Sequence, residues 1–144
     1  MNQNATEMMH ATCVARGGRA LLLVGPSGSG KSDLALRLID AGFDLVSDDQ
    51  VILSVKSEKL LAAPPPSIAG KMEVRGIGIV EIAHRPDQPV ALFVDLTQKP
   101  PRLPDGDESE TILGITIPRI ALVAPEASAA AKVTLALDKV GLHF

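Results

Sequence analysis

Residues 25–32 have the sequence Gly25-Pro26-Ser27-Gly28-Ser29-Gly30-Lys31-Ser32, which matches the pattern G-x-x-x-x-G-K-[ST] at every fixed position. In this pattern the glycines let the backbone curl, so that successive N–H groups point at phosphate oxygens. Lys31 supplies a compact cation for the β- and γ-phosphates, and the hydroxyl of Ser32 is offered to Mg²⁺. The stretch predicts a nucleotide-binding P-loop. Transporters, switches, motor proteins and kinases share this loop, so other residues must decide the chemistry.

The segments around this loop predict the strand and helix that the motif requires. Residues 20–24 are short and wholly apolar, which indicates a buried strand, and Gly17-Gly18 joins them to the apolar residues 12–15 in a predicted hairpin. Residues 32–41 have apolar side chains on one face, which predicts a helix. Residues 43–47 predict a second strand. Strand, helix and strand make a βαβ unit with parallel strands.

The rest of the chain predicts a single α/β domain over residues 1–144. We expect a mobile loop where prolines and acidic residues gather, and a bent strand or a loop where Gly76 and Gly78 interrupt an apolar run. The predicted strands are 50–55, 60–63, 90–96 and 115–123, the last of them interrupted by Pro118. The bent segment is 73–82, the loop is 98–110 and the last helix is 126–140.

Composition argues against nucleic acid as a partner. The chain has 46% hydrophobic and 22% charged residues, as an ordinary globular protein does, and its net charge is −3. A surface that follows a phosphate backbone is normally basic. The chain has no Trp or Tyr and only three Phe, so it also lacks the aromatic rings on which single-stranded bases stack.

The single cysteine and the lack of long apolar segments indicate in which cellular compartment the protein is expected. Cys13 has no partner for an internal disulfide, and we expect it to be a small buried apolar residue. The first residues are polar and lack the apolar region of a signal peptide. No apolar run approaches the roughly 20 residues of a membrane span. The expected location is the cytoplasm, with no membrane partner.

Asp48 and Asp49 follow the predicted strand 43–47. The carboxyl ends of strands in a parallel sheet are where ligands bind, so the pair faces the γ-phosphate if its strand neighbours the one before the P-loop. Successive residues of a strand point in opposite directions, so the two carboxylates can have different roles. One can accept the proton of an attacking hydroxyl, and the other can hold Mg²⁺ through water. The alternative is a solvated turn.

Four blocks of the sequence, in order, resemble the C-terminal catalytic domain of the bacterial HPr kinase/phosphorylase family. They are His10, fifteen residues before the P-loop, then the P-loop itself, then Leu45-Val46-Ser47-Asp48-Asp49 and Met72-Glu73-Val74-Arg75-Gly76-Ile77-Gly78-Ile79. The last block is not a general nucleotide motif. The resemblance covers roughly residues 10–123.

The resemblance implies a fold, a reaction and a set of site residues. The family has a P-loop kinase fold of the phosphoenolpyruvate carboxykinase type, with a mixed sheet and few helices. Its members use ATP and Mg²⁺ to phosphorylate a serine of the phosphocarrier protein HPr. By this resemblance Lys31 binds phosphate, Ser32 and Glu73 are Mg²⁺ ligands, the Asp48-Asp49 pair contains the base, with Asp48 favoured, and His10 and Arg102 fall at catalytic positions.

Two departures from the family limit what carries over. The chain is too short for the separate N-terminal domain of full-length members, which form hexamers, so a homo-oligomer remains an open expectation. The family has a Gly-Arg-Asn segment that is tied to the phosphorylase direction, and here that region is Pro125-Glu126-Ala127-Ser128-Ala129-Ala130. We therefore predict the kinase direction and leave the phosphorylase direction open.

Simpler interpretations stay open for several residues. Alone, His10 would be a solvated histidine, and Glu73 with Arg75 could be a surface ion pair. Gly76 and Gly78 could form a bulge, or could allow close approach to a protein partner. At the level of function, a small-molecule kinase and a non-catalytic ATP-binding sensor are the alternatives to a protein kinase.

Overall fold

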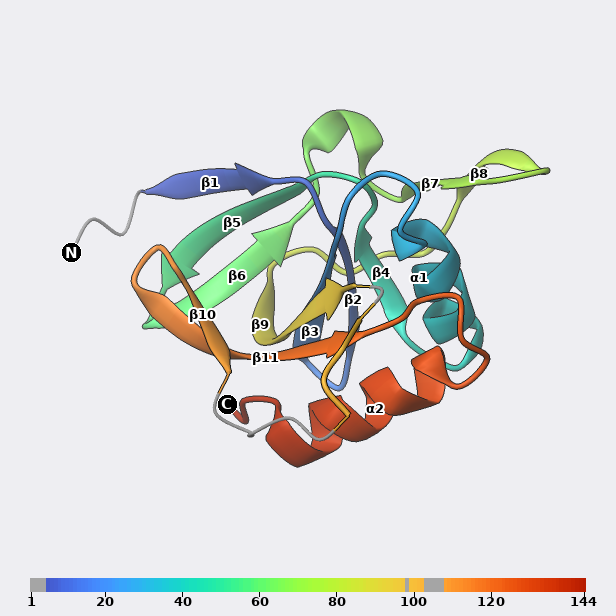
Figure 1. The fold of residues 1–144 in the computed structure, drawn as a ribbon. Coiled ribbons are helices and arrows are strands. Elements are labelled where there is room, and N and C mark those ends of the chain that lie inside the picture. The colour runs from blue at the N-terminus through green and yellow to red at the C-terminus, as the bar shows by residue number, and fades with distance from the viewer. Residues whose placement is uncertain (1–4, 98, 103–107) are drawn as a thin grey trace.

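The computed structural model describes residues 5–97, 99–102 and 108–144 (Figure 1). Within that part, no helix has the length and apolarity to cross a membrane. The strands are β1 (Thr6–Met9), β2 (Thr12–Arg16), β3 (Arg19–Val24), β4 (Asp44–Ser47), β5 (Val51–Lys56), β6 (Lys59–Ala63), β7 (Lys71–Val74), β8 (Gly78–Glu81), β9 (Gln88–Leu96), β10 (Ser109–Ile112) and β11 (Ile115–Leu122). The helices are α1 (Lys31–Asp40), the 3₁₀ helix η1 (Pro66–Ile68) and α2 (Ala129–Val140).

The hairpin that leads into the P-loop forms as predicted. Strands β2 and β3 pair antiparallel, and the turn residues Gly17 and Gly18 have φ angles of 63° and 75°. Positive φ at both positions is what a two-residue type I′ turn requires, and glycine adopts it without steric cost. The P-loop and α1 follow β3 directly, so the strand–loop–helix context of the motif is confirmed.

One nine-stranded mixed sheet organises the molecule. Its main path runs β1-β5-β6-β9-β3-β2-β4, and β11 pairs with β9 and with β10. Strands β3, β9 and β11 are parallel neighbours, whereas β2 is antiparallel to both β3 and β4. Strands β3 and β4 therefore point the same way, as the βαβ unit predicts, but they are not neighbours because β2 lies between them.

Both faces of β3 are buried, which explains its unbroken apolar sequence. Leu21 and Leu23 pack in the cluster that contains the buried residues of α1 and α2, and Ala20 and Leu22 pack in the other cluster, with residues of β5 and β6. Alternate side chains of a strand point to opposite faces, so one strand serves both cores. Figure 1 shows α1 and α2 on one side of β3 and the β5–β6 hairpin on the other.

Several local predictions need correction. The polar start of the chain was not predicted to pair, yet β1 adds to the sheet beside β5. The segment 73–82 is neither a bent strand nor a loop, because β7 and β8 form a hairpin of their own with Gly76 and Gly78 at φ 87° and 116°. That hairpin is a separate two-stranded sheet, and it extends away from the body in Figure 1.

The second half of the chain follows the prediction more closely. The predicted interruption at Pro118 is wrong, because β11 is continuous through this residue, which lies opposite Ser109 of β10. The predicted loop 98–110 is wrong at its end, since β10 begins at Ser109. Its residues 98 and 103–107, with the start of the acidic run, lie outside the described residues. The last helix begins at Ala129, three residues after the predicted start.

Candidate active site

The P-loop is a tight turn between β3 and α1, and its glycines allow either its backbone conformation or its close packing. Gly28 and Gly30 have φ angles of 83° and 96°, in the left-handed region that glycine adopts most readily. A Cβ atom at Gly30 would lie 3.1 Å from the Cβ of Ala124, and one at Gly25 would lie 2.6 Å from Ser29 Oγ. The loop is therefore packed against the turn after β11 and against itself.

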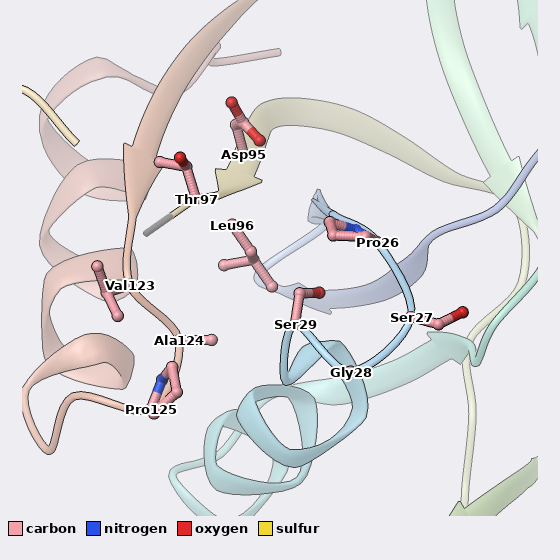
Figure 2. A pocket seen from close by; sticks show the side chains of 10 residues that line it. All are labelled: Pro26, Ser27, Gly28, Ser29, Asp95, Leu96, Thr97, Val123, Ala124 and Pro125. Carbon is pink, nitrogen blue, oxygen red and sulfur yellow. The ribbon is translucent and has the colours of Figure 1, made fainter. Parts of the chain in front are cut away.

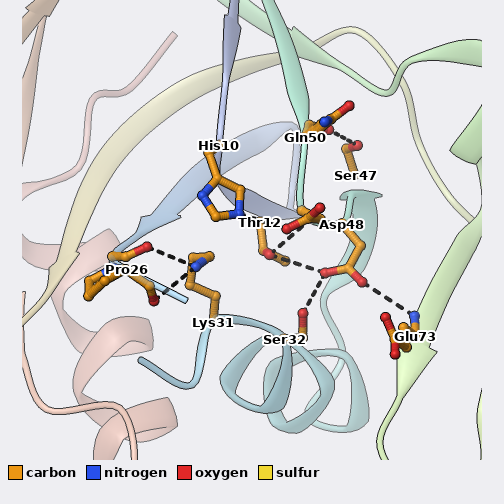
Figure 3. Close-up of polar contacts among 11 residues, drawn as sticks. His10, Thr12, Pro26, Lys31, Ser32, Ser47, Asp48, Gln50 and Glu73 are labelled. Atoms are coloured by element: carbon orange, nitrogen blue, oxygen red, sulfur yellow. Dashed lines mark hydrogen bonds and ion pairs between the residues drawn. The ribbon is translucent and has the colours of Figure 1, made fainter. Parts of the chain in front are cut away.

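Lys31 folds over the P-loop. Its Nζ donates to the carbonyl oxygens of Gly25, at 2.8 Å, and Pro26, at 3.2 Å (Figure 3). The residue is buried although it carries a charge, and these carbonyls offset part of the cost of that burial. The ammonium group thus lies at the mouth of the loop, where a phosphate would replace carbonyl oxygens as its partner.

Asp48 is buried beyond the end of β4 and accepts three hydrogen bonds. Its Oδ1 accepts from Ser32 Oγ at 2.7 Å and from Thr12 Oγ1 at 3.1 Å, and its Oδ2 accepts from the backbone N–H of Glu73 at 3.3 Å. The carboxylate therefore joins the start of α1, the start of β2 and strand β7 (Figure 3). It reaches the P-loop helix although a whole strand separates β4 from β3.

Asp49 has a different environment from its neighbour. Its side chain is 67% exposed, and its Oδ1 lies 2.8 Å from Nε2 of His10. The residue has a φ of 68°, which turns the chain sharply between the two carboxylates. Its backbone N–H donates to Thr12 Oγ1 at 3.3 Å. The two aspartates thus lie in different surroundings, and separate roles for them stay a prediction. His10 is exposed, as the simpler interpretation expected, but it is paired with Asp49.

One pocket of about 560 Å³ collects most of the residues that the sequence singled out. It lies between the P-loop, the aspartate pair and β7. Among the predicted site residues, Ser27, Gly28, Gly30, Lys31, Ser32, His10, Asp48, Asp49 and Glu73 line it, and Arg75 lines it as well. Arg102 is exposed and is absent from the described lining of this pocket, so the structure does not bring it to the others.

The pocket has the chemistry to hold Mg²⁺ together with a phosphate group. Within the described ranges, no three His, Cys, Asp or Glu side chains form a cluster that could hold a metal alone. Mg²⁺ usually keeps several waters and takes only one or two protein carboxylates beside substrate phosphates. The Ser32 hydroxyl, Asp48 and Glu73 fit that partial ligand set.

Thr12 is a site residue that the sequence did not reveal. It is fully buried, and its hydroxyl contacts both the carboxylate of Asp48 and the amide of Asp49. A polar residue at the start of an otherwise apolar strand was the available signal. Cys13, the next residue, is buried as predicted, and burial raises the pKa of its thiol far above the usual range.

A second pocket, of about 640 Å³, opens on the other side of the P-loop (Figure 2). It is lined by loop residues 26–29 and by the segments that follow the ends of β9 and β11. None of residues 95–97 and 123–125, which line it, was predicted to belong to a site. They lie far apart along the chain and match no motif.

Comparison with known proteins decides the family. The family model described as the HPr serine kinase C-terminal domain matches residues 2–137. This chain belongs to that family. The match extends beyond residues 10–123, over which the four blocks indicated the resemblance.

Members of the HPr serine kinase family from several bacteria share about a third of the residues. The HPr kinase/phosphorylase of Lacticaseibacillus casei (strain BL23) is 33% identical over 125 residues, which cover 78% of this chain and 39% of that protein. The one from Chlorobium phaeobacteroides (strain BS1) is 32% identical over 151 residues, covering 96% and 44%. The chain thus spans about two fifths of the length of these relatives.

A solved structure from the same family supports the fold. The Hpr(Ser) kinase/phosphatase from Coxiella burnetii superposes with a TM-score of 0.79 at 28% identity, over 92% of this chain and 94% of that chain. The predicted α/β class, with a mixed sheet and few helices, is confirmed. The family's P-loop kinase fold therefore carries the pocket described above.

Proposed function

We propose that this chain is an ATP-dependent serine kinase that phosphorylates the phosphocarrier protein HPr. The observation that carries the proposal is the 560 Å³ pocket, where Lys31, Ser32, Asp48 and Glu73 converge in a chain of this family. Phosphoryl transfer needs positioning and charge neutralisation more than covalent help. The pocket offers a phosphate-binding loop, a cation, candidate Mg²⁺ ligands and a carboxylate base within one volume.

The proposed reaction assigns a role to each of these residues. The P-loop amides and Lys31 bind the β- and γ-phosphates. Ser32 and Glu73 would hold Mg²⁺, which would supply positive charge beside those phosphates. The serine oxygen of HPr bonds to the γ-phosphorus as the bond to the β-phosphate oxygen breaks, and ADP leaves. The serine proton passes to the aspartate pair, to Asp48 in the assignment that we favour. His10, paired with Asp49, orients that second carboxylate.

The proposal is limited to the kinase direction. In place of the family's Gly-Arg-Asn segment, which is tied to phosphorolysis, the chain has residues 125–130 in the turn before α2 and in its first two residues. Arg102 keeps its proposed catalytic role only if the exposed segment that carries it moves toward the pocket when substrates bind.

A transfer assay tests the proposal directly. The purified protein is mixed with Mg-ATP and HPr, and phosphoserine is sought by mass spectrometry, with an HPr lacking the acceptor serine as control. We expect one phosphate on serine of the intact HPr and none on the control. Nucleotide binding without any transfer would favour the sensor, and transfer to a metabolite but not to HPr would favour a small-molecule kinase.

The β7–β8 hairpin supports a protein as acceptor. Its first strand supplies Glu73 to the pocket, and Arg75 in the turn also lines it. Ile77 and Ile79, at the turn and in β8, are 76% and 74% exposed, among the most exposed large apolar side chains that the structure describes. Apolar residues this exposed beside a reaction pocket indicate contact with another protein. A small metabolite inside the pocket would leave them in water.

Replacing Ile77 and Ile79 together by serine is expected to raise the KM for HPr at least tenfold, because the docked hairpin would lose apolar burial worth more than about 1.4 kcal/mol. The kcat and the affinity for ATP should stay unchanged, since neither side chain lines the pocket. Steady-state kinetics with varied HPr measure the effect.

The matched control for this pair is Met8→Ser, which also removes an exposed apolar side chain, from β1. It should leave the KM for HPr unchanged. If the double variant leaves that KM unchanged but alters the sedimentation of the protein, the hairpin contacts another copy of the chain and not HPr.

A further inference from the structure

The pocket of Figure 2 lies at one edge of the parallel part of the sheet. Strands β3, β9 and β11 run parallel and side by side, so their carboxyl ends meet at the same edge. The P-loop follows β3, residues 95–97 end and follow β9, and residues 123–125 follow β11. In sheets of this kind ligands bind outside these ends.

The two pockets border the same part of the P-loop. Ser27 and Gly28 line both of them, whereas Asp48 and Glu73 line only the first, and Asp95 and Val123 line only the second. A nucleotide whose phosphates occupy the loop must present its γ-phosphate to the side with the aspartate pair, where the acceptor hydroxyl enters. Its other end then leaves the loop toward the second pocket.

We propose that this second pocket binds the nucleoside part of ATP, with Asp95 accepting a hydrogen bond from a ribose hydroxyl. The inference rests on the proposed use of ATP. The pocket volume of about 640 Å³ falls within the usual range for small-molecule sites. Its apolar side chains suit a flat base, and polar side chains come from the P-loop and from the end of β9. The apolar lining is Pro26, Leu96, Val123, Ala124 and Pro125, and the polar side chains are Ser27, Ser29, Asp95 and Thr97.

Asp95 is held in place for this role. Its Oδ2 accepts a hydrogen bond of 2.5 Å from Arg119 of β11, and its side chain is 29% exposed. The other oxygen, Oδ1, has no hydrogen-bond partner among the residues that the structure describes. A fixed carboxylate with one available oxygen is well suited to a hydroxyl donor.

The opposite wall of the pocket is tied to the P-loop helix. Arg37 of α1 donates to the carbonyl oxygen of Ala124, and at 3.1 Å to that of Glu126. Ala124 also packs against Gly30, as described above. The turn that forms the wall is therefore fixed relative to the phosphate-binding loop, which pre-organises the two halves of one nucleotide site.

The test compares Mg-ATP with inorganic tripolyphosphate, which has the phosphates but no nucleoside. Asp95→Asn is expected to weaken ATP binding about tenfold and to leave tripolyphosphate unchanged, as measured by calorimetry. One of the two analogues, 2′-deoxy-ATP or 3′-deoxy-ATP, should bind the wild type as weakly as Asp95→Asn binds ATP. The affinity for that analogue should be the same in Asp95→Asn as in the wild type. The proposal would be overturned if Asp95→Asn weakened the binding of ATP and of tripolyphosphate equally. It would also be overturned if the substitution weakened the binding of both deoxy analogues as much as that of ATP.

A second variant tests the nucleoside site without changing the contact between Asp95 and Arg119. The chain has no Trp, so Pro125→Trp places a single fluorophore at the rim of the pocket, and Leu135→Trp places one on the exposed side of α2 as control. ATP should change the emission of the first and not of the second, while tripolyphosphate changes neither. An identical response from both positions would contradict the proposal.

These measurements are separable from the proposed reaction because they need no HPr and no turnover. If ATP binds as expected and HPr is not phosphorylated, the kinase proposal fails and the nucleoside site stands. If HPr is phosphorylated while Asp95→Asn and Pro125→Trp show no nucleoside-specific effect, the nucleoside site fails and the kinase proposal stands.

Discussion

Replacing Lys31 by methionine is expected to lower the rate of phosphoryl transfer to HPr by a factor of at least about 10³. The ammonium group is the cation that the P-loop offers to the β- and γ-phosphates, and its charge is worth most where negative charge is transferred. Losing a single donor from such a site typically costs about 10² to 10³ in rate, and Lys31 adds a full charge to its hydrogen bonds.

Methionine is chosen because it keeps most of the buried aliphatic stem of the lysine. The substitution removes the hydrogen bonds to the Gly25 and Pro26 carbonyls, so thermal unfolding must be compared with that of the wild type. Phosphoserine formation under single-turnover conditions measures the chemical step. Lys31→Arg should not restore the rate, since the larger planar guanidinium does not fit a buried point-charge site. A Lys31→Met protein that retains transfer within tenfold of the wild type would refute this role.

Asp48→Asn is expected to reduce kcat by about 10² to 10⁴, the range that general-base catalysis contributes. The amide has the shape of the carboxylate, and its oxygen can still accept from Ser32 and Thr12. It cannot take up the serine proton. The measurement is the rate of the first turnover with saturating Mg-ATP, accompanied by a Mg²⁺ titration, because the contact with Ser32 also couples Asp48 to the proposed metal site.

Asp49→Asn is the matched comparison, because it makes the same chemical change one residue away. The Asp49 side chain is exposed and contacts His10, so we expect a loss of about tenfold or less, since a surface pair of this kind is weak. If Asp49→Asn costs more than Asp48→Asn at saturating Mg²⁺, the exposed carboxylate is the base and Asp48 serves the metal instead.

The parts of the site that are contiguous in sequence could be predicted. The P-loop, its preceding strand and its helix are specified by eight consecutive residues and by local apolar patterns. The glycine turn at Gly17-Gly18 likewise fixes a hairpin through local backbone preference. The aspartate pair was found because it directly follows a recognisable strand.

The order of strands could not be predicted, because apolar periodicity says which face is buried but not which strand is adjacent. The position of β2 between β3 and β4 is therefore the main topological result of the structure. The hairpin β7–β8 was missed for a related reason: two four-residue strands around glycines look like one interrupted run. Residues of the second pocket, such as Asp95 and Val123, come together only through the parallel pairing of β9 and β11.

Strand β2 lies between the strand that leads to the P-loop and the strand that leads to the aspartates. The distance between the bound phosphate and the carboxylates therefore depends on how the β2–β3 hairpin is paired. Thr12 begins β2 opposite Leu23, and the pairing with β4 shifts between Cys13 and Val14. A one-residue slip would turn Thr12 to the other face and withdraw the hydroxyl that joins the two aspartates. Lengthening the Gly17-Gly18 turn by one residue should thus change the distance between the P-loop and the aspartates. It would do so without replacing any residue that contacts a substrate.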